Sequence, residues 1–118
     1  MINKEPNVMF SIGGDEWPGL SKLAEECGEV TQIIGKLMGT GGRSDHWDGT
    51  NLRERLIEEI GDVLAACEFV ADFNLMMLEV HSRRDIKLSL FEKWRMDSRI
   101  GIRSEVSTRE LKESDSYV

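Results

Sequence analysis

Two long segments of this sequence carry apolar residues at three- and four-residue steps, and a polar, glycine-rich stretch separates them. The first segment runs from Leu20 to Met38, and the second runs from Leu52 to Val70. Residues at this spacing fall on one face of an α-helix, so both segments are predicted to be helices. A weaker pattern over roughly residues 76–97 predicts a third helix, with these residues facing inward: Leu78, Ile86, Leu90 and Trp94. Strand patterns are nearly absent, which predicts an all-α fold.

Glycine, proline and capping residues indicate where these helices begin and end. Pro18 suits the first turn of the first helix, because its missing N–H would have no partner there. Residues 39–50 are too polar and too rich in glycine for a regular element, so the first helix should end near residue 39. Thr50 or Asn51 can cap the second helix, which should end near Asn74.

The chain has 118 residues, which suits a single domain. Residues 1–16 have only scattered apolar positions and are expected to form an N-terminal arm or loop. Residues 17–99 hold the predicted helices and form the predicted domain. Residues 100–118 are polar with little periodicity, so we expect a flexible C-terminal tail or an arm that orders on a partner chain.

Charge and composition narrow the classes of partner. The formal net charge is −7, which argues against nucleic acid as a partner because such proteins usually present a basic face. The sequence shows no signal peptide and no apolar run long enough for a membrane, so we expect no membrane partner and a cytoplasmic location. The two cysteines, Cys27 and Cys67, lie among apolar residues and are interpreted as small core residues rather than a disulfide.

One short segment occurs twice. Residues 25–30 read Glu-Glu-Cys-Gly-Glu-Val, and residues 58–63 read Glu-Glu-Ile-Gly-Asp-Val. Each copy lies in the middle of a predicted helix and carries a glycine, which costs about 1 kcal/mol relative to alanine at such a position. The repeated glycine suggests that two helices approach closely there.

The carboxylates of the repeat are spaced to act together. Glu26 and Glu29 are three residues apart, as are Glu59 and Asp62, so each pair lies on one helix face about 4.5 Å apart along the axis. Two such faces packed together bring four carboxylates around one small space. Several would have to take up protons unless a cation lay between them. Oxygen ligands of this kind suit Mg²⁺, Mn²⁺ or Ca²⁺ better than zinc, although a solvated acidic face is the alternative.

The spacing Glu25-Glu26-x-x-Glu29, followed after 29 residues by Glu59-x-x-Asp62, resembles the EExxE…ExxD signature of the MazG-like, all-α nucleoside triphosphate pyrophosphohydrolases. The resemblance covers roughly residues 17–95. It implies a core like a four-helix bundle, completed by dimerisation or by a dimer of dimers. It also implies a Mg²⁺-dependent enzyme, with Mn²⁺ as a substitute, that converts (d)NTP to (d)NMP and pyrophosphate. The residues carried over as metal ligands and catalytic groups are Glu26, Glu29, Glu59 and Asp62.

Basic residues on the second and third helices bind the phosphates in proteins of this family. The resemblance therefore makes Arg55, one turn before Glu59, the first candidate for a phosphate contact. Further candidates lie on the third helix: Arg84, Lys87 and Lys93. This region departs from better-known members, which often have an asparagine near the lysine; here no asparagine follows Asn74.

Two tryptophans are candidates for binding the nucleotide base, because aromatic rings stack on purines and pyrimidines. Trp17 precedes the first motif and could instead pack as a hydrophobic staple at the helix start. Trp47 lies in the loop and could instead anchor that loop or contact another subunit. His46 could bind metal, but a lone surface histidine is the simpler interpretation. Some compact, often phage-encoded family members act on (d)GTP and others on dUTP or dCTP, so (d)GTP is one possible preference.

Two further expectations follow from the pattern as a whole. Three helices with long apolar stripes leave one face of so short a chain uncovered, which predicts a homodimer or a larger even oligomer. The alternative function is that of a non-catalytic helical protein, in which the carboxylates are solvated or bind a cation and the third helix is a docking surface.

Overall fold

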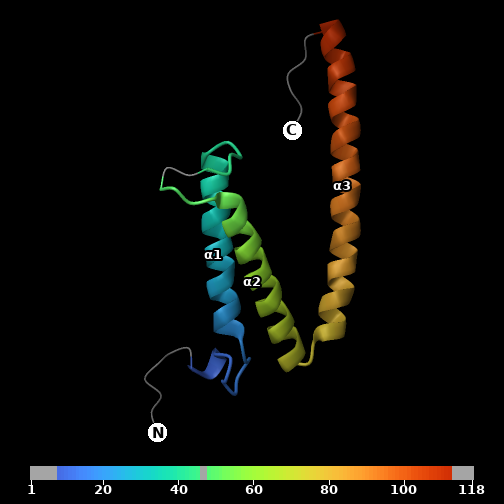
Figure 1. The fold of residues 1–118 in the computed structure, drawn as a ribbon. Coiled ribbons are helices and arrows are strands. Elements are labelled where there is room, and N and C mark those ends of the chain that lie inside the picture. Colours follow the sequence, from blue (N-terminus) through green and yellow to red (C-terminus); the bar gives the residue numbers. More distant parts are fainter. Residues whose placement is uncertain (1–7, 46–47, 113–118) are drawn as a thin grey trace. The chain divides into compact units, whose positions relative to one another are not determined.

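The computed structural model describes residues 8–45 and 48–112, and within these ranges the fold is helical (Figure 1). A short 3₁₀ helix, η1 (Val8–Phe10), precedes α1 (Leu20–Gly39), α2 (Leu52–Phe73) and α3 (Met77–Lys112). The described residues contain no strand, which confirms the prediction of an all-α fold. The chain divides into two compact units, residues 1–77 and 78–118, and each is described by itself.

Helices α1 and α2 pack side by side as an antiparallel pair (Figure 1). Ile33 of α1 and Leu52 of α2 are almost inaccessible to solvent, and burying a side chain of this size contributes about 1.5–3 kcal/mol. Toward the end of α2 the buried apolar residues are Ala66, Val70 and Ala71. These are small or short side chains, so the axes of the two helices can lie close together.

Gly19 allows α1 to begin against the end of α2. Its φ of 89° lies in the left-handed region, and a Cβ built on it would lie 2.6 Å from the Phe69 ring. The Asn74 side-chain amide donates to the Pro18 carbonyl oxygen at 3.1 Å, which ties the end of α2 to the same turn. Pro18 therefore lies before the helix rather than in its first turn, because the backbone reverses at Gly19.

The ends of α2 follow the sequence prediction closely. The Asn51 side chain accepts a hydrogen bond from the Glu54 backbone N–H at 3.0 Å, so Asn51 caps the helix. At the other end α2 stops at Phe73, and the Asn74 backbone N–H still donates to the Val70 carbonyl oxygen at 3.1 Å.

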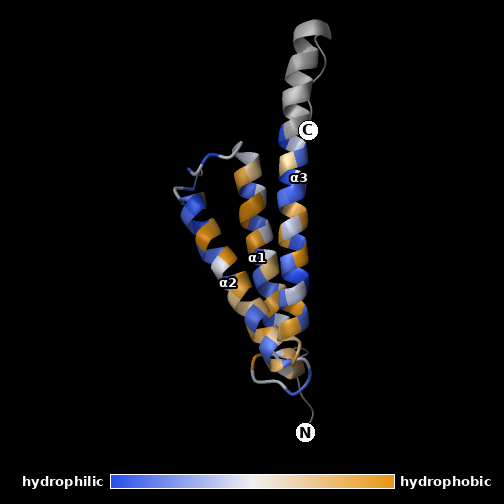
Figure 2. Ribbon diagram, turned by 90° about the vertical axis from the view of Figure 1, so that its right-hand side faces the viewer, coloured by the Kyte–Doolittle hydropathy of each residue, from blue (hydrophilic) through white to orange (hydrophobic). Residues whose placement is uncertain are grey.

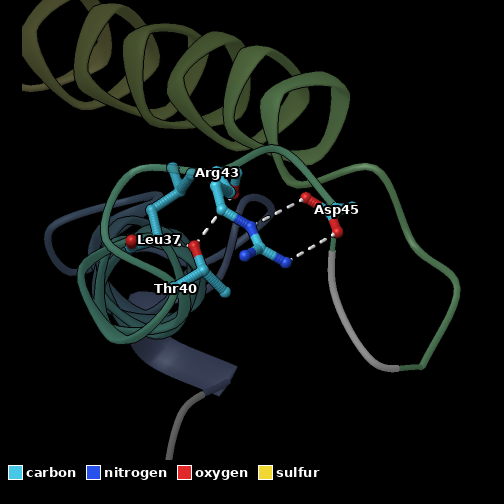
Figure 3. Close-up of polar contacts among 4 residues, drawn as sticks. All are labelled: Leu37, Thr40, Arg43 and Asp45. Carbon is cyan, nitrogen blue, oxygen red and sulfur yellow. Dashed lines mark hydrogen bonds and ion pairs between the residues drawn. The ribbon is translucent and has the colours of Figure 1, made fainter.

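The loop between α1 and α2 is held by its own polar contacts (Figure 3). The Thr40 hydroxyl lies 3.0 Å from the Leu37 carbonyl oxygen and 2.9 Å from that of Arg43, and it can donate to either. The Arg43 guanidinium donates to both carboxylate oxygens of Asp45, at 3.4 and 3.2 Å. These contacts link the last turn of α1 to the first residues of the loop.

Helix α3 is longer than predicted and continues to Lys112 rather than ending near residue 97. The flexible tail or partner-ordered arm expected over residues 100–118 stays a prediction, and residues 113–118 lie outside the described ranges. Residues 100–112 continue α3 as a helix. The physical reason is that this stretch contains no proline and a single glycine, Gly101, so nothing in it strongly opposes a helix. No helix in the described ranges is both long enough and apolar enough to cross a membrane.

Several apolar residues predicted to face inward are exposed. On α3, Leu78, Ile86 and Trp94 are exposed and Leu90 is half-buried, because α3 is the sole helix described in its unit. On the other two helices the exposed members of the apolar stripes include Leu20, Ile34, Met38, Ile60 and Leu64. Figure 2 shows hydrophobic and hydrophilic residues interspersed along both α1 and α2. Cys27 is also exposed and Cys67 half-buried, so neither is a fully buried core residue.

Candidate metal centre

The four carboxylates of the repeated motif come together in the structure. Glu26 and Glu29 project from α1, and Glu59 and Asp62 project from α2. One oxygen from each of the four lies within 4.8 Å of the others. The three-residue spacing places each pair on one helix face, and the antiparallel packing of α1 and α2 turns the two faces toward a common space.

Two oxygens of this cluster are buried without a hydrogen-bond partner among the described residues: Glu26 Oε2 and Glu59 Oε2. Glu59 as a whole is only 7% exposed. A buried carboxylate oxygen without a partner is costly, so such a group must take up a proton or meet a cation. The cluster offers only oxygen donors, which are the ligands that Mg²⁺ and Mn²⁺ prefer. The residues present therefore fit a hard divalent cation.

Glu59 shows the electrostatic consequence of this crowding. Burial raises the pKa of its carboxyl above the ordinary value. A hydrogen bond with Glu29, the negative charge of Glu29 and that of Asp62 raise the Glu59 pKa further, whereas the Arg55 charge lowers it. Glu29 and Glu59 can share a hydrogen bond only when one of them carries a proton. A divalent cation between these carboxylates would displace that proton.

A basic residue lies one helical turn before the first ligand of each motif. Arg55 Nη2 is 3.7 Å from Glu59 Oε1 on α2, and Lys22 Nζ is 4.0 Å from Glu26 Oε1 on α1. Lys22 is also 3.1 Å from Glu25, whose hydrogen bond and charge raise the pKa of the lysine. Arg55 was predicted from the sequence as a phosphate contact, whereas Lys22 was not.

A signal for Lys22 was present in the sequence. The repeat is nine residues long rather than six: Lys-Leu-Ala-Glu-Glu-Cys-Gly-Glu-Val at residues 22–30 aligns with Arg-Leu-Ile-Glu-Glu-Ile-Gly-Asp-Val at residues 55–63. Extending the comparison by one turn toward the N-terminus would have aligned the two basic residues.

The chain matches the family model of the MazG nucleotide pyrophosphohydrolase domain over residues 19–83, which is more than half of its length. The chain belongs to this family. The matched region contains both copies of the motif and therefore all four clustered carboxylates. Comparison with curated proteins and with solved structures found no match.

The remaining site candidates comprise tryptophans, a histidine and three basic residues of α3. Trp17 is 53% exposed and lies in the turn before α1, while Trp47 and His46 fall outside the described residues.

The three candidates on α3 belong to the other unit and make local contacts there. Arg84 pairs with Asp85 at 2.9 Å, and Lys93 pairs with Asp97 at 3.3 Å. Lys87 Nζ lies 5.6 Å from the centroid of the Phe91 ring and 5.3 Å from that of the Trp94 ring. Their role in binding substrate stays a prediction.

A pocket of about 340 Å³ adjoins one end of the carboxylate cluster in the MazG domain. Two of the four carboxylates, Glu26 and Asp62, form part of its wall, together with Lys22. The other lining residues are mainly apolar: Ile12, Gly19, Ala65, Ala66 and Phe69. A concave, mostly apolar space with a few polar groups is typical of sites for small organic ligands.

The two glycines of the repeat do not lie at a close contact between α1 and α2. A Cβ built on Gly28 or on Gly61 meets no atom within 4 Å. The expectation that these glycines bring the two motif helices together is therefore wrong for this pair. The small residues that α2 does bury include Ala66 and Ala71.

Proposed function

We propose that this protein is a Mg²⁺-dependent nucleoside triphosphate pyrophosphohydrolase that converts (d)NTP to (d)NMP and pyrophosphate. The observation that carries this proposal is the carboxylate cluster, in which two buried oxygens lack a hydrogen-bond partner among the described residues. Membership of the MazG family supports the reaction class. An acidic pocket with no cation would repel a triphosphate, so the proposal requires the cation as well as the carboxylates.

Glu26, Glu29, Glu59 and Asp62 would hold Mg²⁺, with Mn²⁺ as a substitute. When bound, the metal supplies neutralisation of the triphosphate charge and a lowered pKa for the attacking water. The protein residues orient the reactants and handle protons. A carboxylate oxygen of the cluster that does not contact the metal would accept the proton that water loses. Arg55, which is 39% exposed and faces Glu59, is placed to balance negative charge on the phosphates.

The proposed reaction is attack on the α-phosphorus. The water oxygen forms a bond to that atom, and the bond from the α-phosphorus to the oxygen that bridges the α- and β-phosphates breaks. Pyrophosphate leaves with the bonding electrons, and the monophosphate keeps the oxygen from water. No covalent bond to the protein forms.

A panel of (d)NTPs incubated with Mg²⁺ tests the proposal, with the products separated by chromatography. We expect monophosphate and pyrophosphate in equal amounts, and no hydrolysis when a chelator removes the metal. A (d)GTP preference would appear as faster turnover of dGTP or GTP than of the other nucleotides. Diphosphate and phosphate as primary products would contradict the proposal. Cation binding without hydrolysis of any nucleotide would support the alternative, a non-catalytic helical cation-binding protein.

We also propose that the MazG domain works as a homodimer or a larger even oligomer in the cytoplasm. Exposed apolar residues on α1 and α2 support this assembly, because so many on a small domain usually mark an interface. They include Ile34, Met38, Ile57, Ile60 and Leu64. Sedimentation at micromolar concentration should show a dimer or tetramer. An active, monodisperse monomer would contradict the proposal.

A further inference from the structure

We propose that Lys22 and Arg55 are positioning residues that make the carboxylate cluster select Mg²⁺ and Mn²⁺ over Ca²⁺. Each basic side chain faces one oxygen of the neighbouring glutamate and leaves the other oxygen to meet the cation. This inference rests on the metal site of the proposed function and adds the residues that determine which cation the site accepts. It concerns the protein and the metal alone, without a nucleotide.

The first glutamate of each motif divides its two oxygens in the same way. Glu59 Oε1 lies 3.7 Å from Arg55 Nη2, and Glu26 Oε1 lies 4.0 Å from Lys22 Nζ. The other oxygen of each glutamate, Oε2, is buried and has no hydrogen-bond partner among the described residues. The nine-residue repeat explains why both helices show this division, because it places a basic residue four positions before each of these glutamates.

This division limits how each glutamate can bind a metal ion. A carboxylate that binds through both oxygens must turn both toward the ion, and the ion would then lie close to the basic group that faces Oε1. Repulsion between the divalent cation and that group opposes the arrangement. Glu59 is buried and Glu26 half-buried, so salt screens this repulsion poorly. Each of the two glutamates therefore offers one oxygen to the cation.

Carboxylates that each offer a single oxygen suit Mg²⁺ better than Ca²⁺. Mg²⁺ takes an octahedral set of ligands at about 2.0–2.1 Å, whereas Ca²⁺ takes roughly six to eight oxygens at about 2.3–2.6 Å and often binds both oxygens of a carboxylate. Mn²⁺ accepts the same oxygen ligands as Mg²⁺. A glutamate that is free to bind through both oxygens would favour Ca²⁺, and a glutamate restricted to one oxygen favours Mg²⁺.

The two basic residues restrict their glutamates to different degrees. Arg55 lies closer to its glutamate than Lys22 does, and Glu59 is more buried than Glu26. Lys22 also divides its contacts, because it donates a hydrogen bond to Glu25 at 3.1 Å. We therefore expect Arg55 to contribute more to the selectivity between cations than Lys22 does.

Calorimetry with each metal alone tests the inference. The measured quantity is the dissociation constant for Ca²⁺ divided by that for Mg²⁺. Removing a positive charge tightens the binding of both cations, but the two carry the same charge, so this effect cancels in the ratio. We expect Arg55→Met to lower the ratio roughly tenfold and Lys22→Met to lower it less. The conservative variant Lys22→Arg should keep the ratio of the wild-type protein.

The matched controls are Arg53→Met and Lys36→Met, which remove a like charge from the same two helices but leave the residues of the cluster and their basic neighbours unchanged. Neither control should change the ratio. An unchanged ratio in Arg55→Met, or an equal decrease in the controls, would overturn the inference. If the variants shift the ratio as expected but the wild-type protein hydrolyses no nucleotide, the proposed function fails and the inference stands, so the two failures are distinguishable.

Discussion

The two copies of the motif share a sequence pattern but occupy different surroundings. The α1 copy lies on a helix with one buried residue, Ile33, whereas α2 buries five residues and carries the other copy. Glu59 of the α2 copy is one of those five, while Glu26 at the equivalent position of α1 is half-buried. Local sequence thus decides which carboxylates share a face, and the deeper burial of Glu59 on α2 raises the pKa of its carboxyl.

The largest expected effect tests whether the two copies are equally necessary. Glu26→Gln or Glu29→Gln on α1, and Glu59→Gln or Asp62→Asn on α2, keep the shape of each side chain but remove a ligand charge. We expect each variant to lose at least about a hundredfold in the rate of (d)NTP hydrolysis. Steady-state assays at saturating Mg²⁺ check this. Near-normal rates in any two of the four variants would end the metal-site proposal.

The next effect concerns how the helices are joined. Gly19→Ala places a Cβ against the Phe69 ring at a positive φ, so we expect the free energy of unfolding to fall by at least about 1–2 kcal/mol. Urea unfolding without metal measures the change. An unchanged midpoint would show that the turn before α1 can rearrange and that Gly19 is not required there.

Replacing the glycines of the motif should stabilise the protein, in contrast to replacing Gly19. A Cβ at Gly28 meets nothing within 4 Å, so Gly28→Ala should raise the free energy of unfolding by about 0.8–1 kcal/mol through better helix propensity. The same holds for Gly61→Ala on α2. Destabilisation measured in the assembled protein would mean that a second subunit packs against these glycines.

The two helix starts differ in their caps. The Asn51 side chain caps α2, whereas no side chain caps α1 at Gly19. Asn51→Ala should therefore lower the free energy of unfolding by about 1 kcal/mol. Thr50→Ala is the control because Thr50 does not cap the helix. Equal losses in the two variants would contradict the assignment of the cap.

The smallest effect concerns protons and stability without metal. Because the pKa of Glu59 is raised in the folded protein, its protonation favours folding, and stability from this group falls as pH rises through the ordinary carboxyl range and the raised pKa. Glu59→Gln should remove that decline and make the metal-free protein more stable near neutral pH. Thermal melts in chelator between pH 4 and 8, measured in roughly unit steps, compare the wild-type protein with Glu59→Gln. If the stability of Glu59→Gln fell with rising pH as much as that of the wild-type protein, another group would be responsible for the decline.

Much of this molecule could be predicted from local patterns. The end of α1 at Gly39, the cap at Asn51 and the end of α2 before Asn74 depend on residues within a few positions of each boundary. The carboxylate pairs were also predictable, because a three-residue spacing on a helix has one geometric outcome. The repeat, together with the expectation that the two helices pack against each other, also predicted that the two carboxylate pairs would face a common space.

Other features depend on contacts between distant parts of the chain. The start of α1 after Pro18 depends on Phe69, fifty residues from Gly19, and the pocket beside Lys22 depends on the same contact. The raised pKa of Glu59 and the burial of Ile33 depend on which faces of α1 and α2 meet, and a period of 3.6 residues cannot show which of two apolar faces will be covered. Periodicity describes a helix by itself, whereas burial and charge environment belong to the pair of helices and appear only when they pack.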